Sequence, residues 1–372
     1  MHVLITSDTL NGIWTYTREL VSGLISRGWR VTLVSFGEIP MPEQTAWMDR
    51  LRGLEYHPTA FRVDWMQEGQ QDFGDASDYL CALAKELKPD LIHSNHLCYG
   101  ALPVSVPRIV VAHGDLITWW KAVHGREPKE GAWLRWYRQA ISEGLSQASA
   151  VVAPSEWMLN TIRSSYGCCE REKVIHNGRN PIFFNPYLTK EDSVLAIGRT
   201  LDPAKQLHLL TQHNHPVPVC VVGADETSQS SRLPVRADVS FSDGSVGVAL
   251  KGAQSEPQLR LLYSRAAMFA GTARYEVSGM AILEAALSRC ALILNDIPSL
   301  REIWGHAAVY FRANDADSLA EAVRILSSDV QMRRNFANRA FQRARECFNA
   351  TRMTDNYIQL YHSVATHKAR AA

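Results

Sequence analysis

The sequence predicts an α/β protein built from two doubly wound parallel sheets. The chain has 372 residues, enough for two domains that each bury a sizeable core. Short apolar runs alternate with segments of helical periodicity from residue 3 onward, as expected for successive strand–helix–strand units. The alternation is interrupted at residues 176–181 (HNGRNP), where Asn-Gly and proline are typical of a linker, and it then resumes.

The first series begins with a strand predicted at residues 3–6. A helix follows that carries Ile13, Tyr16 and Leu20 on one apolar face, and Gly28 is expected to end it before the next strand. The later strands of this series are predicted at residues 31–35, 91–94, 108–112, 150–154 and 173–175.

The second series supplies six further apolar runs with helical segments between them. They are predicted as strands at residues 194–198, 217–223, 246–251, 268–271, 291–295 and 308–311. Two such series predict two sheets that face each other across a central cleft, with ligands at the carboxyl ends of the strands.

We expect an N-terminal domain of residues 1–178 and a C-terminal domain of residues 179–348. The last segment, residues 349–372, is expected to pack back on the N-terminal domain. The residues of its apolar face are Met353, Tyr357, Leu360, Tyr361 and Val364.

Composition excludes several classes of protein. The chain is 46% hydrophobic and 21% charged with a formal charge of +1, which argues against disorder and gives no case for a nucleic-acid partner. No apolar run reaches membrane-spanning length and no leader pattern precedes the first strand, so a cytoplasmic location is expected. The seven cysteines have no zinc or CxxC spacing and are predicted to be free thiols.

Glu276 and Glu284 are the most informative pair of residues. They lie in residues 273–287 (ARYEVSGMAILEAAL), where a loop runs into an apolar helix. Backbone N–H groups at the helix N-terminus, next to Ser278 and Gly279, are suited to an anion, and the carboxylates to hydroxyls, a combination that a sugar nucleotide presents. The alternative is two solvated glutamates. The apolar neighbours of Glu284 argue instead that this charge has a partner.

Arg199 and Lys205 follow a predicted strand in residues 196–205 (AIGRTLDPAK). A planar guanidinium can hold two phosphate oxygens at once, and a flexible ammonium can neutralise the remaining charge of a leaving diphosphate. We interpret the two cations as a diphosphate clamp. The alternative is a pair of surface cations in weak salt bridges.

Two strand ends of the first series carry further candidates. In residues 9–14 (TLNGIW), Gly12 permits close approach of the backbone to a phosphate or an acceptor, with Asn11 and Trp14 beside it. In residues 110–115 (VVAHGD), His113 ends a strand, and Asp115 either caps the next helix or orients an acceptor hydroxyl. A packing turn and a structural histidine are the alternatives.

Residues 119–137 place four tryptophans near several cations. Aromatic faces suit sugar rings and cations suit phosphate, so Trp119 and Trp120 are predicted to bind the acceptor, with a membrane surface as another use of the same region. The alternative is that Trp133 and Trp136 serve the core of an ordinary helix.

Two groups of charged residues are interpreted first as structural features and not as ligand-binding sites. Asp315 and Asp317 form a DxD pattern but precede a helical segment, so we expect helix-capping acids and no metal site. The basic C-terminal region is expected to be a solvated face, with contact to an anionic membrane as the second interpretation. Its cations are Arg333, Arg334, Arg339, Arg343, Arg345, Arg352, Lys368 and Arg370.

Nearly the whole chain resembles family 4 of the retaining glycosyltransferases, whose GT-B fold has two Rossmann-like domains. Residues 196–205 resemble the family's Gly-Arg and Lys, and residues 275–287 its E-x7-E element. The stretch after that element is matched by residues 295–303 (NDIPSLREI). The chain departs from the family in having Glu-Val-Ser-Gly at residues 276–279 in place of Glu-Pro-Phe-Gly, and Asn11 in place of the first glycine of a Gly-Gly loop.

The resemblance implies roles for these residues. Glu276 would hold hydroxyls of the transferred sugar and Glu284 those of the ribose, while His113 would lie beside the donor sugar. Backbone N–H groups of Ser278, Gly279 and Met280 would face phosphate or sugar oxygens.

The implied reaction is transfer with retention from a nucleoside-diphosphate sugar, UDP first and GDP next, to a hydroxyl of a saccharide, a glycolipid or a small molecule. It needs no metal and no cofactor. The alternatives are a sugar-nucleotide epimerase or hydrolase of the same fold, and a non-catalytic sugar-nucleotide-binding protein.

Overall fold

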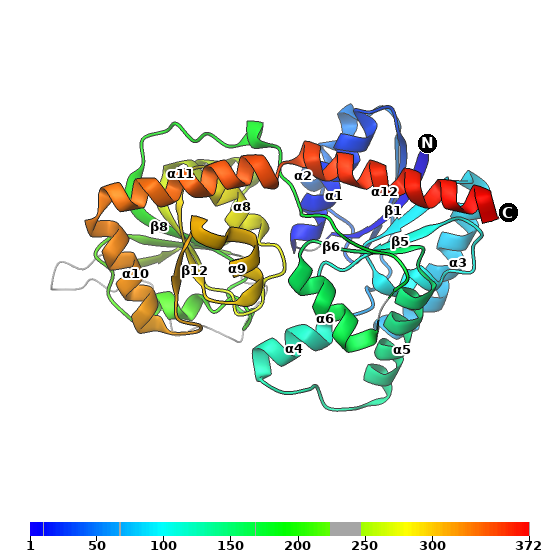
Figure 1. Cartoon of the computed structure of the whole chain (residues 1–372), viewed down its shortest axis with the longest axis horizontal. Coiled ribbons are helices and arrows are strands. Elements are labelled where there is room, and N and C mark those ends of the chain that lie inside the picture. Colours follow the sequence, from blue (N-terminus) through cyan, green and yellow to red (C-terminus); the bar gives the residue numbers. More distant parts are fainter. Residues whose placement is uncertain (10, 67, 168, 224–246, 372) are drawn as a thin grey trace. The chain divides into compact units, whose positions relative to one another are not determined.

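The computed structural model describes residues 1–9, 11–66, 68–167, 169–223 and 247–371, with only the backbone described for residues 11 and 367–371. The chain divides into two compact units (Figure 1). The first comprises Met1–Thr118, Glu127–Gly178 and Ala350–Ala372, and the second comprises Trp119–Arg126 and Arg179–Asn349. The domains expected from the sequence differ from these units in Trp119–Arg126 and in Asn349.

The first unit contains a seven-stranded parallel sheet of order β3-β2-β1-β4-β5-β6-β7. Its chain order reverses between β1 and β4, which is the position where doubly wound sheets bind ligands. The strands are β1 (His2–Asp8), β2 (Arg30–Phe36), β3 (Leu54–Pro58), β4 (Leu91–Ser94), β5 (Arg108–Val111), β6 (Ala150–Ala153) and β7 (Glu172–Val174). β3 was not predicted, because it lies at the sheet edge and is only partly buried, so that it lacks a continuous apolar run.

The helices of the first unit are α1 (Asn11–Ile25), α2 (Pro42–Thr45), α3 (Gly69–Leu87), α5 (Ala132–Gln147), α6 (Glu156–Tyr166) and α12 (Ala350–Ala371), with the 3₁₀ turns η1 (Met48–Arg50) and η2 (Leu97–Ala101). A further helix, α4 (Leu116–His124), begins in the first unit and continues in the second. The chain leaves α1 through Gly28, whose φ of 79° favours glycine. On one face of the sheet, Tyr16 and Leu20 of α1 share a core with Tyr357 and Tyr361 of α12.

The second unit contains a six-stranded parallel sheet of order β10-β9-β8-β11-β12-β13. Its chain order reverses between β8 and β11, so the loops that follow these two strands lie at the switch point of the sheet. The strands are β8 (Glu191–Ile197), β9 (Val219–Val222), β10 (Val248–Leu250), β11 (Ala266–Gly271), β12 (Ala291–Asn295) and β13 (Val309–Phe311).

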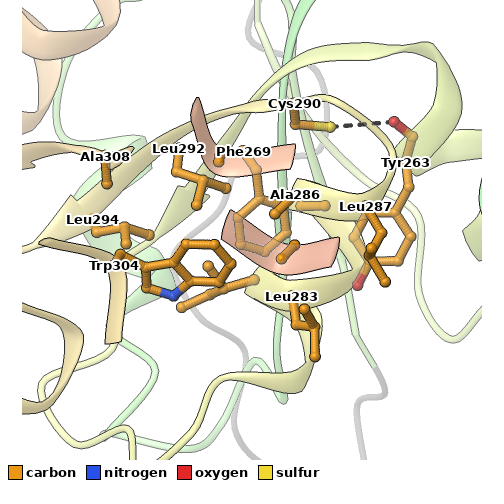
Figure 2. Close-up of a cluster of buried hydrophobic side chains, with 14 of the residues drawn as sticks. Tyr263, Phe269, Leu283, Ala286, Leu287, Cys290, Leu292, Leu294, Trp304 and Ala308 are labelled. Carbon is orange, nitrogen blue, oxygen red and sulfur yellow. Dashed lines mark hydrogen bonds between the residues drawn. The ribbon is translucent and has the colours of Figure 1, made fainter. Parts of the chain in front are cut away.

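The helices of the second unit are α7 (Glu256–Arg265), α8 (Met280–Leu287), α9 (Pro298–Trp304), α10 (Ala316–Ser328) and α11 (Val330–Cys347), with the 3₁₀ turns η3 (Pro181–Phe183), η4 (Leu207–Thr211) and η5 (Gly305–Ala307). Figure 2 shows the core that fixes α8: Leu283 and Leu287 belong to the same buried cluster as Phe269 of β11 and the fully buried Trp304 of α9. This packing holds the N-terminus of α8 at the carboxyl end of β11.

None of the described helices combines the length and the apolar character needed to cross a membrane. The described cysteines are free thiols, and Cys168 lies outside the described residues. They are Cys81, Cys98, Cys169, Cys220, Cys290 and Cys347.

Candidate active site

Two loops at the switch point of the second sheet are tied together by hydrogen bonds. The loop after β11 donates from the Arg274 N–H to the Ala204 carbonyl at 2.8 Å. Thr272 Oγ1 donates to the Lys205 carbonyl at 2.6 Å. These bonds place the loop that carries Lys205 against the loop that carries Glu276.

Lys205 and Glu276 form an ion pair across these loops, with Nζ 2.8 Å from Oε2. Burial lowers the pKa of Lys205, but the Glu276 carboxylate outweighs burial and the pKa is raised overall, so the side chain is cationic. The second oxygen, Oε1, accepts the Gly279 N–H at 3.0 Å, and the Glu276 carbonyl accepts Ser299 Oγ. Glu276 is therefore fixed at its backbone and at both carboxylate oxygens.

Gly279 is the N-cap of α8 and adopts a left-handed conformation (φ 69°, ψ 62°). A Cβ at this position would lie 2.9 Å from Ile282 Cδ1, so both the conformation and the space favour glycine. The sequence predicted three backbone donors for an anion, but the Gly279 N–H is already taken by Glu276. The Met280 N–H, in the first turn of α8, has no hydrogen-bond partner among the described residues.

Glu284, in the middle of α8, pairs with a buried arginine. Its Oε1 lies 2.9 Å from Arg179 Nε, with the two side chains 15% and 2% exposed. Burial, then the charge of Glu284 and a hydrogen bond to it, raises the pKa of the Tyr263 hydroxyl. The prediction that this charge has a partner is confirmed. Arg179 itself was missed, because nothing in a polar Asn-Gly-Arg-Asn run indicates a buried cation.

Arg199 follows β8 and is 40% exposed, with Nη2 2.9 Å from Asp202 Oδ2. Asp202 is nearly buried and its Oδ1 also accepts the Ala204 N–H at 2.9 Å, which fixes the turn between Arg199 and Lys205. In this structure the weak salt bridge considered as the alternative is formed. A diphosphate would have to draw Arg199 away from Asp202.

A buried amide holds the loop that carries Glu276. Asn295, at the end of β12, donates from Nδ2 to the Ala273 carbonyl at 3.1 Å, and its Oδ1 accepts the Asn314 N–H at 3.0 Å. The Gln206 amide satisfies its neighbours when its oxygen faces Arg274, and this oxygen then accepts from Arg274 Nε at 2.9 Å. Arg274 Nη1 donates to the Val123 carbonyl at 3.0 Å. Of these residues the sequence singled out only Asn295, as the start of a family stretch.

In the first unit, His113 follows β5 and lies 2.9 Å, through Nε2, from Oδ1 of Asn95, which follows β4. Burial, with smaller contributions from His93 and His96, lowers the pKa of His113 to about 3. The imidazole is therefore neutral near pH 7, and it acts as a hydrogen-bonding group and not as a cation.

The turn after β1 enters α1 at Asn11, and Gly12 is the second residue of that helix. The side chain of Asn11 lies outside the described atoms. Trp14, expected near the acceptor, is 8% exposed and belongs to the core, where its Nε1 donates to the Gln44 carbonyl at 3.1 Å. Because it lies on the buried face of α1, its ring packs against that of Trp47, with the two centroids 6.1 Å apart.

Asp115 caps α4, as one of the two interpretations of the sequence expected. Its Oδ2 accepts the Thr118 N–H at 3.0 Å, and its Oδ1 accepts the hydroxyls of Tyr137 at 2.9 Å and Tyr166 at 2.7 Å. The side chain is 5% exposed. Both oxygens are therefore engaged by the protein in this structure.

Trp119 and Trp120 lie on α4 and are half-buried. The ring centroid of Trp120 lies 4.1 Å from that of His124, and its Nε1 is buried without a hydrogen-bond partner among the described residues. Trp133 and Trp136 are half-buried on α5, where Trp133 stacks on Tyr137. The aromatic region is therefore split between two helices.

The acids of the DxD pattern serve α10. Asp315 is its N-cap and accepts the Ser318 N–H at 2.9 Å, while Asp317 pairs with His213 at 2.8 Å. Within the described ranges, no group of three or more metal-ligating side chains is found.

The basic C-terminal region is partly engaged within the protein. Arg333 pairs with Asp192, and Arg343 donates to the Ile303 carbonyl. The side chains of Lys368 and Arg370 lie outside the described residues.

Comparison with known proteins defines the class. The model of Glycosyltransferase Family 4 matches residues 10–182, and that of Glycosyl transferases group 1 matches residues 188–343. The chain belongs to glycosyltransferase family 4 and is a glycosyltransferase with the GT-B fold. The predicted family and fold class are thereby confirmed.

Three known proteins are similar to this chain in sequence or in fold. Alpha-maltose-1-phosphate synthase of Mycolicibacterium smegmatis (strain ATCC 700084 / mc(2)155) is 24% identical over 304 residues, which is 73% of this chain and 76% of that protein. Sucrose-phosphate synthase from Thermosynechococcus elongatus has a TM-score of 0.77 at 16% identity, covering 99% of this chain and 100% of the other. Anabaena HepE in complex with UDP-glucose has a TM-score of 0.73 at 17% identity, covering 98% and 100%.

Proposed function

We propose that this glycosyltransferase moves a sugar from a nucleoside-diphosphate sugar to a hydroxyl acceptor, with retention of configuration and without a metal. A UDP-sugar is the favoured donor and a GDP-sugar the next. The observation that carries the proposal is the Lys205–Glu276 pair at the N-terminus of α8, because it places a cation, a carboxylate and the Met280 N–H at the switch point of one sheet. A donor needs these groups for its diphosphate and its sugar hydroxyls. Anabaena HepE, which shares the fold, was solved with UDP-glucose.

The donor-binding roles follow from charge and position. Lys205 and Arg199 neutralise the diphosphate as it leaves, together with backbone N–H groups of residues 278–280. Glu276 holds hydroxyls of the transferred sugar. Glu284 holds ribose hydroxyls with the carboxylate that Arg179 orients. Gly12 brings the start of α1 close to a phosphate.

The proposed chemistry is a front-face displacement that needs no protein nucleophile. The diphosphate departs through an oxocarbenium-like state, and one of its oxygens takes the proton of the acceptor hydroxyl. Glu276 is suited to binding and orientation, since its two oxygens are held by Lys205 and by the Gly279 N–H. His113 contacts the donor sugar as a neutral group.

The acceptor is proposed to be a saccharide, a lipid-linked saccharide or a small molecule. Asn11, Trp119 and Trp120 are the residues proposed to bind it. Trp14 and Asp115, which the sequence also suggested, are buried and hydrogen-bonded within the protein in this structure. Trp119 and Trp120 carry most of this hypothesis because they are half-buried aromatic side chains on one helix. The names of two relatives contain a phosphorylated disaccharide, so sugar phosphates belong among the acceptors to be tested.

Release of nucleoside diphosphate tests the proposal. UDP-, GDP- and ADP-sugars are each incubated with the protein, with and without a panel of sugars, sugar phosphates and glycolipids, in buffer and in excess chelator. We expect acceptor-dependent release that persists in chelator. Release without an acceptor would indicate an epimerase or hydrolase, and thermal stabilisation by a sugar nucleotide without release would indicate a non-catalytic binding protein. Loss of activity in chelator that Mg²⁺ restores would overturn the metal-free mechanism.

The proposed location is the cytoplasm, where free thiols such as those of the described cysteines are stable. Contact with the inner face of a membrane is the second proposal. It assigns the exposed cations of α11 to anionic lipid headgroups. Vesicle co-sedimentation with and without anionic lipid distinguishes the two.

A further inference from the structure

The second unit contains the last part of α4. Residues Trp119–Arg126 belong with Arg179–Asn349, so this part of the helix lies in the same compact unit as the loop that carries Glu276. A hydrogen bond joins the helix to that loop: Arg274 Nη1 donates to the Val123 carbonyl at 3.0 Å. Arg274 lies two residues before Glu276, so the side chain that reaches α4 starts from the proposed donor loop.

The last turn of α4 has carbonyl groups that the helix itself cannot satisfy. Gly125 follows the helix in a left-handed conformation (φ 67°), and its N–H donates to the Lys121 carbonyl at 2.8 Å. The carbonyl of Val123, in the same turn, accepts the guanidinium of Arg274. Because a cation at a helix C-terminus also complements the helix dipole, Arg274 is a side-chain cap of α4. The opposite end of the helix is capped separately by Asp115, so Arg274 bears on the last turn.

The Gln206 amide orients the guanidinium of Arg274. Its oxygen accepts from Arg274 Nε at 2.9 Å, while its nitrogen donates to Asn314 Oδ1 at 2.6 Å and to the Thr272 carbonyl at 3.2 Å. This orientation of the amide is required because a guanidinium can only donate and a carbonyl can only accept. Arg274 is therefore held through Nε at Gln206 and through Nη1 at Val123.

Gln206 holds its amide in place from a backbone conformation that favours glycine. Its φ of 49° and ψ of 34° lie in the left-handed region, which is unfavourable for a residue with a Cβ. The side chain is 2% exposed. The contacts of the amide with Arg274 and Asn314 offset the unfavourable backbone, so a glycine at this position would relieve the strain and lose the contacts.

The last turn of α4 also carries His124, which packs on Trp120. The two ring centroids are 4.1 Å apart, and the Trp119 ring lies 6.1 Å from His124 and 6.4 Å from Trp120. His124 is exposed and the two tryptophans are half-buried, so the three rings form a partly exposed aromatic surface. Such a surface suits the apolar face of a sugar ring. The place of His124 in it depends on the last turn, which Arg274 caps.

We propose that Arg274 is a positioning residue for the acceptor: as the cap of α4 it holds His124 against Trp120. Gln206 orients the guanidinium for this role. The proposal rests on the proposed function, since it extends the acceptor surface of the two tryptophans to His124. It also fixes that surface to the loop of Glu276, the carboxylate proposed to hold the donor sugar.

Hydrogen exchange tests the cap without any substrate. The backbone amides of residues 120–125 are followed by mass spectrometry in the wild type, Arg274→Met and Gln206→Gly. We expect exchange about 10-fold faster in Arg274→Met, the scale of one lost hydrogen bond to a charged group. A smaller acceleration is expected in Gln206→Gly, which keeps the cation and removes only the amide that orients it.

Arg312→Met is the matched control. Arg312 directly follows β13 of the same sheet and pairs with Asp315, so this variant also removes a paired cation from the carboxyl edge. Unchanged exchange in Arg274→Met overturns the cap, as does an equal acceleration in Arg312→Met. Unchanged exchange in Gln206→Gly overturns the orienting role of the amide.

Kinetics tests whether the cap serves the acceptor. Arg274→Met is expected to raise the KM for the acceptor about 5- to 20-fold, while the dissociation constant of the sugar nucleotide, measured by calorimetry, changes less than about twofold. A general loss of structure would weaken both together. An unchanged acceptor KM alongside faster exchange overturns the positioning role, and so does an equal loss of donor affinity. Absence of transfer in the wild type refutes the proposed function and leaves the exchange result on α4 unaffected.

Discussion

Arg179 and Glu284 form a buried ion pair in which Nε lies 2.9 Å from Oε1. Arg179 is 2% exposed, and its guanidinium lies 5.3 Å from the centroid of the Phe184 ring. Its backbone N–H donates to the Phe348 carbonyl at 3.1 Å. The carboxylate proposed to bind ribose is therefore oriented by a cation that the backbone fixes at the start of the second unit.

Arg179→Met is expected to destabilise the second unit by about 3–5 kcal/mol, because it leaves the Glu284 charge without its partner. Urea unfolding measures the loss. The double variant Arg179→Met/Glu284→Gln is the control, since it removes both charges and is expected to recover at least about half of the stability. A cost below about 1 kcal/mol for Arg179→Met would show that the pair does not hold Glu284.

Glu276→Gln and Glu284→Gln are expected to impair the binding of different parts of the donor. Glu276→Gln should lower kcat/KM for the sugar donor with little effect on the affinity for free nucleoside diphosphate, because only the donor carries the sugar. Glu284→Gln should weaken both ligands, because both contain ribose. We expect losses of about 1.5–3 kcal/mol, typical of a hydrogen bond to a charged group. Steady-state kinetics measures kcat/KM for the donor, and calorimetric titration with sugar nucleotide and bare nucleotide measures the affinities. Identical profiles of the two variants would refute the separate roles.

Much of the fold could be predicted because parallel strands buried on both faces are continuous apolar runs. The strands at Leu91–Ser94 and Ala291–Asn295 were predicted with their observed bounds. The partly buried edge strand Leu54–Pro58 was missed because it lacks such a run. The grouping of Trp119–Arg126 with the second unit has no signal in the local composition, since tertiary packing determines it.

The candidate site was predicted where function requires a particular side chain at a strand end or a helix N-terminus. Lys205 and Glu276 were named and lie together. The partners that orient the site could not be predicted in the same way. Arg179 contacts Glu284 and Asn95 contacts His113, and one sequence carries no signal for such pairs.

The buried histidines are expected to make the first unit sensitive to acid. Burial lowers the pKa of His93 to about 4 and those of His96 and His113 to about 3, whereas an unfolded histidine titrates near 6.5. Below pH 6.5 the unfolded chain therefore binds more protons, so stability is full above that pH and is lost as the pH falls from 6.5 toward 3. The loss at pH 5 is about 2 kcal/mol for each histidine.

Urea unfolding at pH 7.5 and pH 5 measures this dependence. His96→Gln is the control, because it removes one titrating group whose Nε2 is buried without a hydrogen-bond partner among the described residues. The variant should show a pH dependence smaller by about 2 kcal/mol. An unchanged difference between the two pH values would mean that His96 is protonated to the same extent in the folded and unfolded states.

The proposed diphosphate clamp of Lys205 and Arg199 predicts that loss of either cation slows the reaction. Lys205→Ala and Arg199→Ala are each expected to raise the activation free energy by about 2–4 kcal/mol, the scale of losing one preorganised charged donor, and to weaken donor binding. The Lys205 variant should lose more, because this side chain is 29% exposed against 40% for Arg199, and water screens its charge less. Arg324→Ala is the matched control, since Arg324 belongs to the same unit and, like Arg199, pairs with an acid three residues away. Steady-state kinetics and donor titration of the three variants test the clamp. Wild-type rates in both Lys205→Ala and Arg199→Ala would exclude it. An equal loss in Arg324→Ala would assign the effect to the general charge of the second unit.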